Sequence, residues 1–207
     1  SYLLGSIVGA LLVGLLRGVD IRELGSGNAG GTNALRTQGP GFALAVVVVD
    51  VGKALVAVGL LPGLALPGVG LDTELDRQWL AVACAIAVVA GHVWPVYHDF
   101  RGGKGAATVI GAVAVLQPLA LLPAVALWLG VVMLTGFVGL GTILACITLP
   151  VAFALLGGGP SVPLVAFGLA MAAFIAWTHR ANIARMRAGT ENRARRLWLL
   201  RPRDAGR

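Results

Sequence analysis

Seven apolar runs separated by short polar segments restrict this chain to few folds. Hydrophobic residues make up 57% of the 207 residues, charged residues only 12%, and the mean hydropathy is +0.87. A soluble domain of this size carries more charge. Continuous apolar runs are typical of membrane-spanning helices and not of barrel strands, whose hydrophobicity alternates. The runs cover residues 2–16, 42–61, 79–96, 106–116, 119–134, 140–156 and 163–178.

This pattern predicts an all-α integral membrane protein. We expect residues 1–207 to form one domain, a bundle of seven transmembrane helices with a basic tail from about residue 179. The 30 glycines suit such a bundle, because small residues let membrane helices pack closely. Two runs are shorter than the roughly 20 residues that cross a bilayer. A five-helix topology is therefore the main alternative.

The distribution of charge predicts the orientation of the bundle. The net charge is +7, and no basic residue precedes the first run, whereas Arg17 follows it. Residues 62–78 carry three acids and one arginine, but the tail from His179 carries nine arginines and two acids. Because basic segments stay in the cytoplasm, we expect the N-terminus outside and the C-terminus inside. The segments 17–36, 99–104 and 135–139 then share the cytoplasmic face with the tail.

A glycine-rich segment between two apolar runs has the composition of an anion site. Residues 91–108 are GHVWPVYHDFRGGKGAAT, in which Gly102, Gly103, Lys104 and Gly105 precede an apolar helix. Glycines let backbone N–H groups converge on an oxyanion, the lysine adds a positive charge, and a helix N-terminus attracts anions. The alternative is a plain turn between two helices.

A second segment on the same face contains neutral donors and one fixed cation. Residues 25–36 are GSGNAGGTNALR. Hydroxyl, amide and backbone N–H groups can bind phosphate oxygens, and arginine can bind a phosphate through two parallel hydrogen bonds. The alternative is a turn followed by a capped helix start. Two such segments on one face favour a phosphate-binding function.

Other polar residues lie inside the apolar runs. Asp50 and Lys53 are three residues apart on one predicted helix and can form an ion pair that faces the bundle. Charges inside a membrane are also candidates for function, which is the alternative to this structural pair. His92 lies near the end of the third apolar run, where it can have a structural role or contact the substrate. We expect Cys84 and Cys146 to be buried free thiols, and no cluster of His, Asp or Glu has the spacing of a metal site.

Three motifs closely resemble those of bacterial acyl-phosphate-dependent glycerol-3-phosphate acyltransferases, the PlsY family. They are GSGNAGGTNALR at 25–36, GHVWPVYHDFRGGKGAAT at 91–108 and HRANIARMRAGTE at 179–191. The resemblance implies a seven-helix enzyme of the bacterial inner membrane, with its active site facing the cytoplasm. It also implies transfer of a fatty acyl group from acyl phosphate to the sn-1 hydroxyl of glycerol 3-phosphate, which yields lysophosphatidic acid and phosphate.

The same resemblance assigns roles to individual residues. It implies a structural role for Glu191, and it is weakest at Gly139, where a family serine is replaced and only Thr142 keeps its hydroxyl. The implied catalytic residues are Ser26, Arg36, Lys104, His179 and Asn182. The implied substrate-binding residues are Gly25, Gly27, Asn28, Thr32, Asn33, His92, Gly102, Gly103, Gly105, Thr108 and Thr142.

The chemistry of the residues agrees with this activity. Acyl phosphate already has a good leaving group, so the protein has to position two anions and neutralise charge. We expect a substrate phosphate oxygen to take the hydroxyl proton, while His179 and Asn182 orient the acceptor or the acyl carbonyl. No cofactor or metal is expected, and no nucleic acid or obligate protein partner, because the tail arginines suit anionic lipids. The alternatives are a phosphate-ester or anion transporter and an inactive lipid-binding relative.

Overall fold

The computed structural model describes residues 1–64, 76–156, 159–195 and 197–200. Helices account for its regular structure, with no strand among these residues, so the predicted all-α class is confirmed for them. Most of the acidic segment 62–78 and the arginines at 196, 201, 203 and 207 lie outside the described residues. The α-helices are α1 (Tyr2–Gly5), α2 (Gly9–Arg17), α3 (Gly31–Gln38), α4 (Pro40–Gly59), α5 (Arg77–Val93), α6 (Ala106–Leu116), α7 (Leu121–Thr135), α8 (Val138–Leu155), α9 (Val162–Thr178) and α10 (Arg180–Arg187).

Fewer helices than predicted are long enough to cross a membrane. Four segments of the described chain qualify by length and apolar composition, at Pro40–Gly63, Arg77–His98, Pro118–Thr135 and Val138–Leu155. A fifth is the pair α9 and α10, which bends by 53° between its two helices. Helix α6 is apolar but has only 11 residues. The count of seven spans and the orientation of the termini therefore stay predictions.

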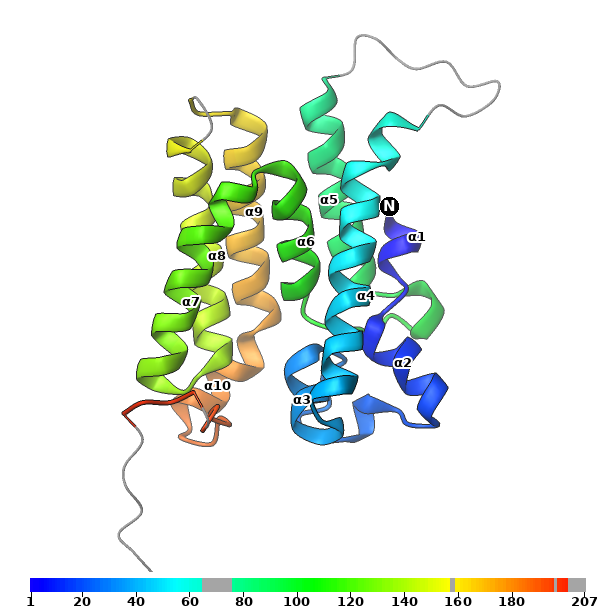
Figure 1. Cartoon of the computed structure of the whole chain (residues 1–207), viewed down its shortest axis with the longest axis vertical. Coiled ribbons are helices and arrows are strands. Elements are labelled where there is room, and N and C mark those ends of the chain that lie inside the picture. The colour runs from blue at the N-terminus through cyan, green and yellow to red at the C-terminus, as the bar shows by residue number, and fades with distance from the viewer. Residues whose placement is uncertain (65–75, 157–158, 196, 201–207) are drawn as a thin grey trace, which may run out of the picture.

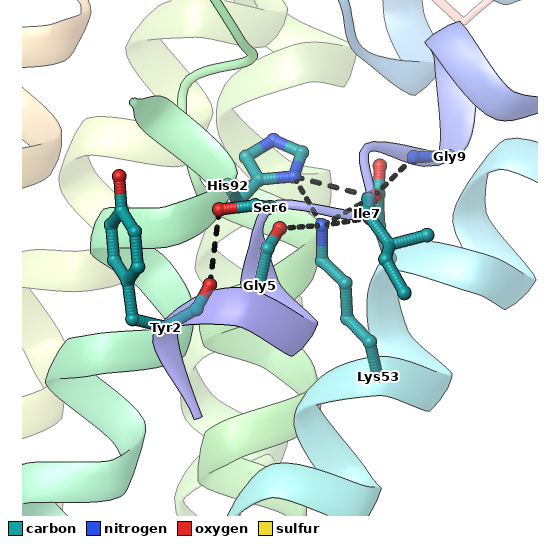
Figure 2. A network of polar contacts seen from close by, with 8 residues as sticks. Tyr2, Gly5, Ser6, Ile7, Gly9, Lys53 and His92 are labelled. Carbon is teal, nitrogen blue, oxygen red and sulfur yellow. Dashed lines mark hydrogen bonds and ion pairs between the residues drawn. The ribbon is translucent and has the colours of Figure 1, made fainter. Parts of the chain in front are cut away.

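The first apolar run is not one helix, so the prediction of a continuous helix over residues 2–16 is wrong. It divides into α1 and α2, which are separated by residues 6–8. Side chains from α4 bind the backbone that this break exposes. Lys53 Nζ donates to the carbonyls of Gly5 and Ile7, both at 2.8 Å (Figure 2). Asp50 accepts from the Gly9 N–H at 3.0 Å. The break is tolerated because its polar groups remain paired.

Helix α6 lies between two groups of helices. Helices α7, α8 and α9 form one group, and α1, α4 and α5 form the other (Figure 1). The short helices α2, α3 and α10 gather at one end of the bundle, and α6 begins above that end (Figure 1). This arrangement directs the N-terminus of α6 toward the polar segments that the sequence placed on one face.

Small residues allow the helices to pack closely. A Cβ atom at Gly111 of α6 would lie 2.5 Å from the Val51 carbonyl oxygen of α4, and one at Gly168 of α9 would lie 2.7 Å from the Pro150 nitrogen of α8. Any larger residue would push these helices apart. Cys146 is buried and Cys84 half-buried, and both are free. The expectation of free thiols is confirmed, and only the full burial of Cys84 is not.

Candidate active site

A polar cavity lies where both helix groups meet the N-terminus of α6. Its wall is built from the segment before α3, the start of α6, the start of α8, and α10 with the residues that follow it. Three predicted motifs, which are far apart in the sequence, therefore meet at one site. The predicted site residues on this wall are Ser26, Asn28, Thr32, Asn33, Arg36, His92, Lys104, Gly105, Thr142, His179 and Asn182.

Four helices begin at this wall, namely α3, α6, α8 and α10. No side chain caps any of their N-termini with a hydrogen bond. The first N–H groups of a helix lack partners within the helix and carry partial positive charge. The helix starts therefore make the cavity electropositive, as the sequence predicted for α6 alone.

A chain of polar contacts connects Lys104 to α10 and the residues beyond it. The Lys104 ammonium donates to Asn182 Oδ1, Asn182 Nδ2 donates to Glu191 Oε1 at 2.7 Å, and Arg185 Nε donates to Glu191 Oε2 at 2.6 Å. Thr178 Oγ1 also donates to the Lys104 carbonyl at 3.0 Å. Burial lowers the pKa of Lys104 to about 8, with a further contribution from the nearby Arg185 cation.

His179 has a defined tautomer at the break between α9 and α10. Its Nδ1 lies 2.8 Å from the Ile175 carbonyl oxygen, which can only accept a hydrogen bond. Nδ1 therefore carries a proton, and the neutral ring presents Nε2 as an acceptor. The side chain is buried on the cavity wall, so His179 can accept a hydrogen bond from a bound hydroxyl group.

Asn33 lies on the wall, and its amide is hydrogen-bonded to the backbone of the segment before α3. Its Oδ1 accepts from the Ser26 N–H at 2.9 Å, and its Nδ2 donates to the carbonyls of Ile21 and Leu24 at 3.1 and 2.9 Å. These bonds use both N–H donors of the amide and hold the segment before α3 in place. Asn33 therefore positions Ser26. Gly25, at φ +57°, passes so close that a Cβ there would lie 2.4 Å from Asn33 Oδ1.

The N–H groups of Gly102 and Gly103 do not form the anion site expected of them. Their N–H groups donate to the carbonyls of Val93 and His92, at 3.2 and 3.1 Å, and so do not converge on an anion. A Cβ at Gly103 would lie 2.1 Å from His92 Nε2, so glycine is needed there for close packing against α5. Only Gly105 of this segment's glycines reaches the wall, as the N-cap of α6.

Some predicted residues lie off the wall, and others on it were not assigned to the site. Gly25, Gly27, Gly102, Gly103 and Thr108 are not among the lining residues, and Thr108 is fully buried. Sequence reasoning assigned Glu191 a structural role and Asp50 an ion pair, and it missed Arg185 as a lining residue. Its charge within a predicted membrane span had made Asp50 a candidate for function, although the structural ion pair was favoured. The lining residues outside the predicted set include Gly30, Gly31, Asp50, Gly139, Arg185, Glu191 and Asn192.

Asp50 belongs to a buried charged cluster behind the cavity. Lys53 Nζ lies 2.9 Å from His92 Nδ1 (Figure 2). Asp50 Oδ1 lies 3.0 Å from Lys53 Nζ and 3.2 Å from His92 Nδ1. The predicted pairing of Asp50 with Lys53 is confirmed. Asp50 and His92 both reach the wall, so the cluster connects the broken N-terminal run to the site.

An apolar groove opens from the polar cavity. The two share six lining residues, and the groove continues between α4, α6, α7 and α8 past Val113, Ala124 and Leu149. Its lining is almost entirely hydrophobic. The site therefore joins an electropositive compartment to a slot that can accommodate a hydrocarbon chain. The shared residues are Gly31, Thr32, Ala106, Ala107, Val138 and Thr142.

Fold and site together define an all-helical integral membrane protein that can bind an anionic headgroup and an apolar chain side by side. The family model described as glycerol-3-phosphate acyltransferase matches residues 1–189. The chain belongs to this glycerol-3-phosphate acyltransferase family.

Curated relatives and solved structures agree with this assignment. A glycerol-3-phosphate acyltransferase of Desulforudis audaxviator is 43% identical, covering 93% of this chain and 91% of its own. One from Halalkalibacterium halodurans is 40% identical with the same coverage. The crystal structure of PlsY (YgiH), an integral membrane glycerol 3-phosphate acyltransferase, in its glycerol 3-phosphate form is 35% identical, with a TM-score of 0.78 over 93% of this chain and 90% of that one. Its lysophosphatidic acid form has a TM-score of 0.75.

Proposed function

We propose that this protein transfers a fatty acyl group from acyl phosphate to the sn-1 hydroxyl of glycerol 3-phosphate, giving lysophosphatidic acid and phosphate. Family membership supports the acyl transfer and the acceptor. The single observation that supports acyl phosphate as the donor is the junction of the electropositive cavity with the apolar groove. An acyl phosphate has the same two parts, a phosphate directly bonded to the carbonyl of a long apolar chain.

The residues of the wall suit a reaction without a covalent enzyme intermediate. The sn-1 oxygen attacks the acyl carbon, the bond from that carbon to the phosphate oxygen breaks, and the hydroxyl proton passes to an oxygen of a substrate phosphate. Lys104, Arg36 and the helix N-termini neutralise the two phosphates. Asn182 and the acceptor nitrogen of His179 orient the attacking hydroxyl.

The proposed location is the bacterial inner membrane, with the cavity open to the cytoplasm. The spans α4, α5, α7 and α8 support a multi-pass membrane protein. The basic residues of the segments around the cavity support the cytoplasmic side, because positive segments remain there.

The test of this proposal is turnover by the purified protein in detergent. We expect phosphate release from palmitoyl phosphate that requires glycerol 3-phosphate and yields lysophosphatidic acid. Palmitoyl-CoA in place of palmitoyl phosphate should give no product. Product from palmitoyl-CoA alone would show that the proposed donor is wrong. No product with either donor, from protein shown to be folded, would favour a transporter or an inactive relative.

Filling the far end of the groove should shorten the preferred acyl chain. Ala124 of α7 is buried and lines the groove away from the polar cavity. With Ala124→Phe, we expect the ratio of kcat/KM for palmitoyl phosphate to that for decanoyl phosphate to fall about tenfold or more. The phenyl ring excludes the last methylene groups of the longer chain, and each methylene group that an apolar pocket binds contributes to kcat/KM. Ala126→Phe is the matched control, because Ala126 is exposed on the same helix. Equal kcat/KM ratios in the two variants would show that the acyl chain does not bind at this end of the groove.

Glycerol 3-phosphate binding should weaken as the pH rises through the pKa of Lys104. Burial lowers this pKa to about 8, so the side chain is a cation at pH 7 and loses its charge above pH 8. We expect the KM for glycerol 3-phosphate to rise between pH 7.5 and 9.5, by up to about tenfold per pH unit once the lysine is neutral. Lys104→Arg stays charged throughout this range, so its KM should be nearly constant. Parallel profiles in both proteins would contradict the assignment.

A further inference from the structure

The segment after α10 caps the C-terminal end of α7. We call residues 190–195 and 197–199 the C-terminal strap; they fold back along the turn between α7 and α8. The last carbonyl groups of a helix lack partners within the helix, and here the strap supplies donors to four in succession. Leu199 N–H donates to Met133 at 2.9 Å, Trp198 Nε1 to Leu134 at 3.1 Å, Arg193 to Thr135 at 3.0 Å and Ala194 N–H to Gly136 at 2.7 Å.

Arg193 is the centre of this contact. Its guanidinium carbon lies 4.3 Å from the ring centroid of Phe137 and 4.2 Å from that of Trp198, so it lies against both aromatic faces. A positive charge at the C-terminus of α7 also interacts favourably with the helix dipole. Gly136 leaves room for the strap, because a Cβ there would lie only 3.0 Å from Arg193 Cβ.

The strap continues directly from the polar chain of the cavity. Glu191 is two residues before Arg193, and its buried carboxylate binds both Asn182 and Arg185. On its other side the chain leaves α10 through Gly189, at φ +71°, with the Thr190 N–H bonded to the Arg185 carbonyl at 2.9 Å. Glu191 is therefore held between two anchors, the end of α10 and Arg193.

We infer that Arg193 is a positioning residue for the active site. Arg193 fixes the strap and thereby holds the Glu191 carboxylate in place. Glu191 then orients Asn182, which binds Lys104. This inference rests on the proposed function for its kinetic test. The match to the family model ends at residue 189, so the strap lies beyond the matched region. Displacement of a catalytic group by about 1 Å can cost 10²-fold in rate, so an anchor outside the cavity can affect the reaction.

The kinetic test compares Arg193→Ala with Arg187→Ala. Both variants remove one exposed arginine, but among the described residues the Arg187 side chain has no hydrogen bond, ion pair or cation–π partner. We expect Arg193→Ala to raise the KM for glycerol 3-phosphate roughly tenfold. A loss of this size matches the usual strength of the cation–π contacts and the hydrogen bond that the variant removes. Arg187→Ala should keep the wild-type KM. Arg193→Lys, which keeps a cation beside both rings, should recover part of the loss.

A double-mutant cycle tests whether the effect passes through Glu191. In a Glu191→Gln background, adding Arg193→Ala should change the KM by less than twofold, because the group that the strap positions is already altered. A full tenfold effect in that background, or an unchanged KM in Arg193→Ala alone, would overturn the inference.

Amide hydrogen exchange tests the same inference without turnover. Relative to Arg187→Ala, the Arg193→Ala protein should exchange faster in peptides covering residues 180–192, with no change in α4. Failure of the proposed function would appear as a wild-type protein without acceptor-dependent product. Failure of the positioning role would appear as equal exchange in the two variants, whether or not the wild type is active.

Discussion

Replacing Lys104 with methionine is expected to lower kcat/KM for glycerol 3-phosphate by about 10²–10³, the usual cost of removing one donor that stabilises developing charge. The variant loses the cation at the start of α6 and leaves Asn182 Oδ1 without the hydrogen bond from the ammonium. Methionine has a similar length and stays apolar, so packing should change little. Lysophosphatidic acid formation under subsaturating glycerol 3-phosphate is the measurement.

Two comparisons separate this effect from misfolding. Lys104→Arg keeps the charge and should retain more activity than Lys104→Met, although the larger guanidinium cannot reproduce the contact with Asn182 in full. The thermal unfolding midpoint of Lys104→Met in detergent should lie close to that of the wild type. Near wild-type kcat/KM in Lys104→Met would show that this lysine does not bind the reacting groups.

Replacing Lys53 with methionine is expected to destabilise the fold by about 3–5 kcal/mol, because it leaves a buried carboxylate without its cation. Lys53 is 6% exposed, and its ammonium binds the Gly5 and Ile7 carbonyls at the break between α1 and α2 (Figure 2). It also forms the ion pair with Asp50. The variant loses all of these contacts at once. Unfolding in mixtures of detergent and SDS, followed by tryptophan fluorescence, measures the change.

A double variant tests the electrostatic origin of this loss. Lys53→Met combined with Asp50→Leu removes both charges and should be more stable than Lys53→Met alone, since replacing a buried pair by apolar residues can be nearly neutral. Recovery should be partial, because Asp50 also accepts from the Gly9 N–H. Arg17→Met, at the exposed end of α2, should change stability by less than about 0.5 kcal/mol. A double variant that is less stable than Lys53→Met would exclude an uncompensated charge as the cause.

The structure also gives a physical reason for the departure at Gly139. A Cβ there would lie 3.0–3.1 Å from atoms of Asn182, which is tighter than most side-chain contacts. Glycine lets the start of α8 approach α10, and Gly139 thereby takes its place on the cavity wall. The residue at which the resemblance is weakest thus packs against the amide that binds Lys104.

The sequence by itself was sufficient to predict the membrane class, the motifs of the site and the pairing of Asp50 with Lys53. Apolar runs report burial in a hydrocarbon environment directly, because each residue contributes to the hydropathy whatever its neighbours are. Charged residues inside such runs are costly, and so Asp50 and Lys53 could be expected to pair. The resemblance of the three motifs implied Ser26, Arg36, Lys104, His179 and Asn182 as catalytic residues, and all five lie on one wall.

Only the tertiary structure decided where backbone groups find their partners. The amides of Gly102 and Gly103 have the same chemistry whether they bind an anion or the carbonyls of α5, and only the contact with α5 distinguishes the two. Hydropathy likewise did not reveal the break after α1, since Lys53, 48 residues from Gly5, satisfies the exposed carbonyl there. The strap on α7 is also a long-range contact. Local sequence determines composition and periodicity, whereas pairings between distant segments depend on how the whole chain packs.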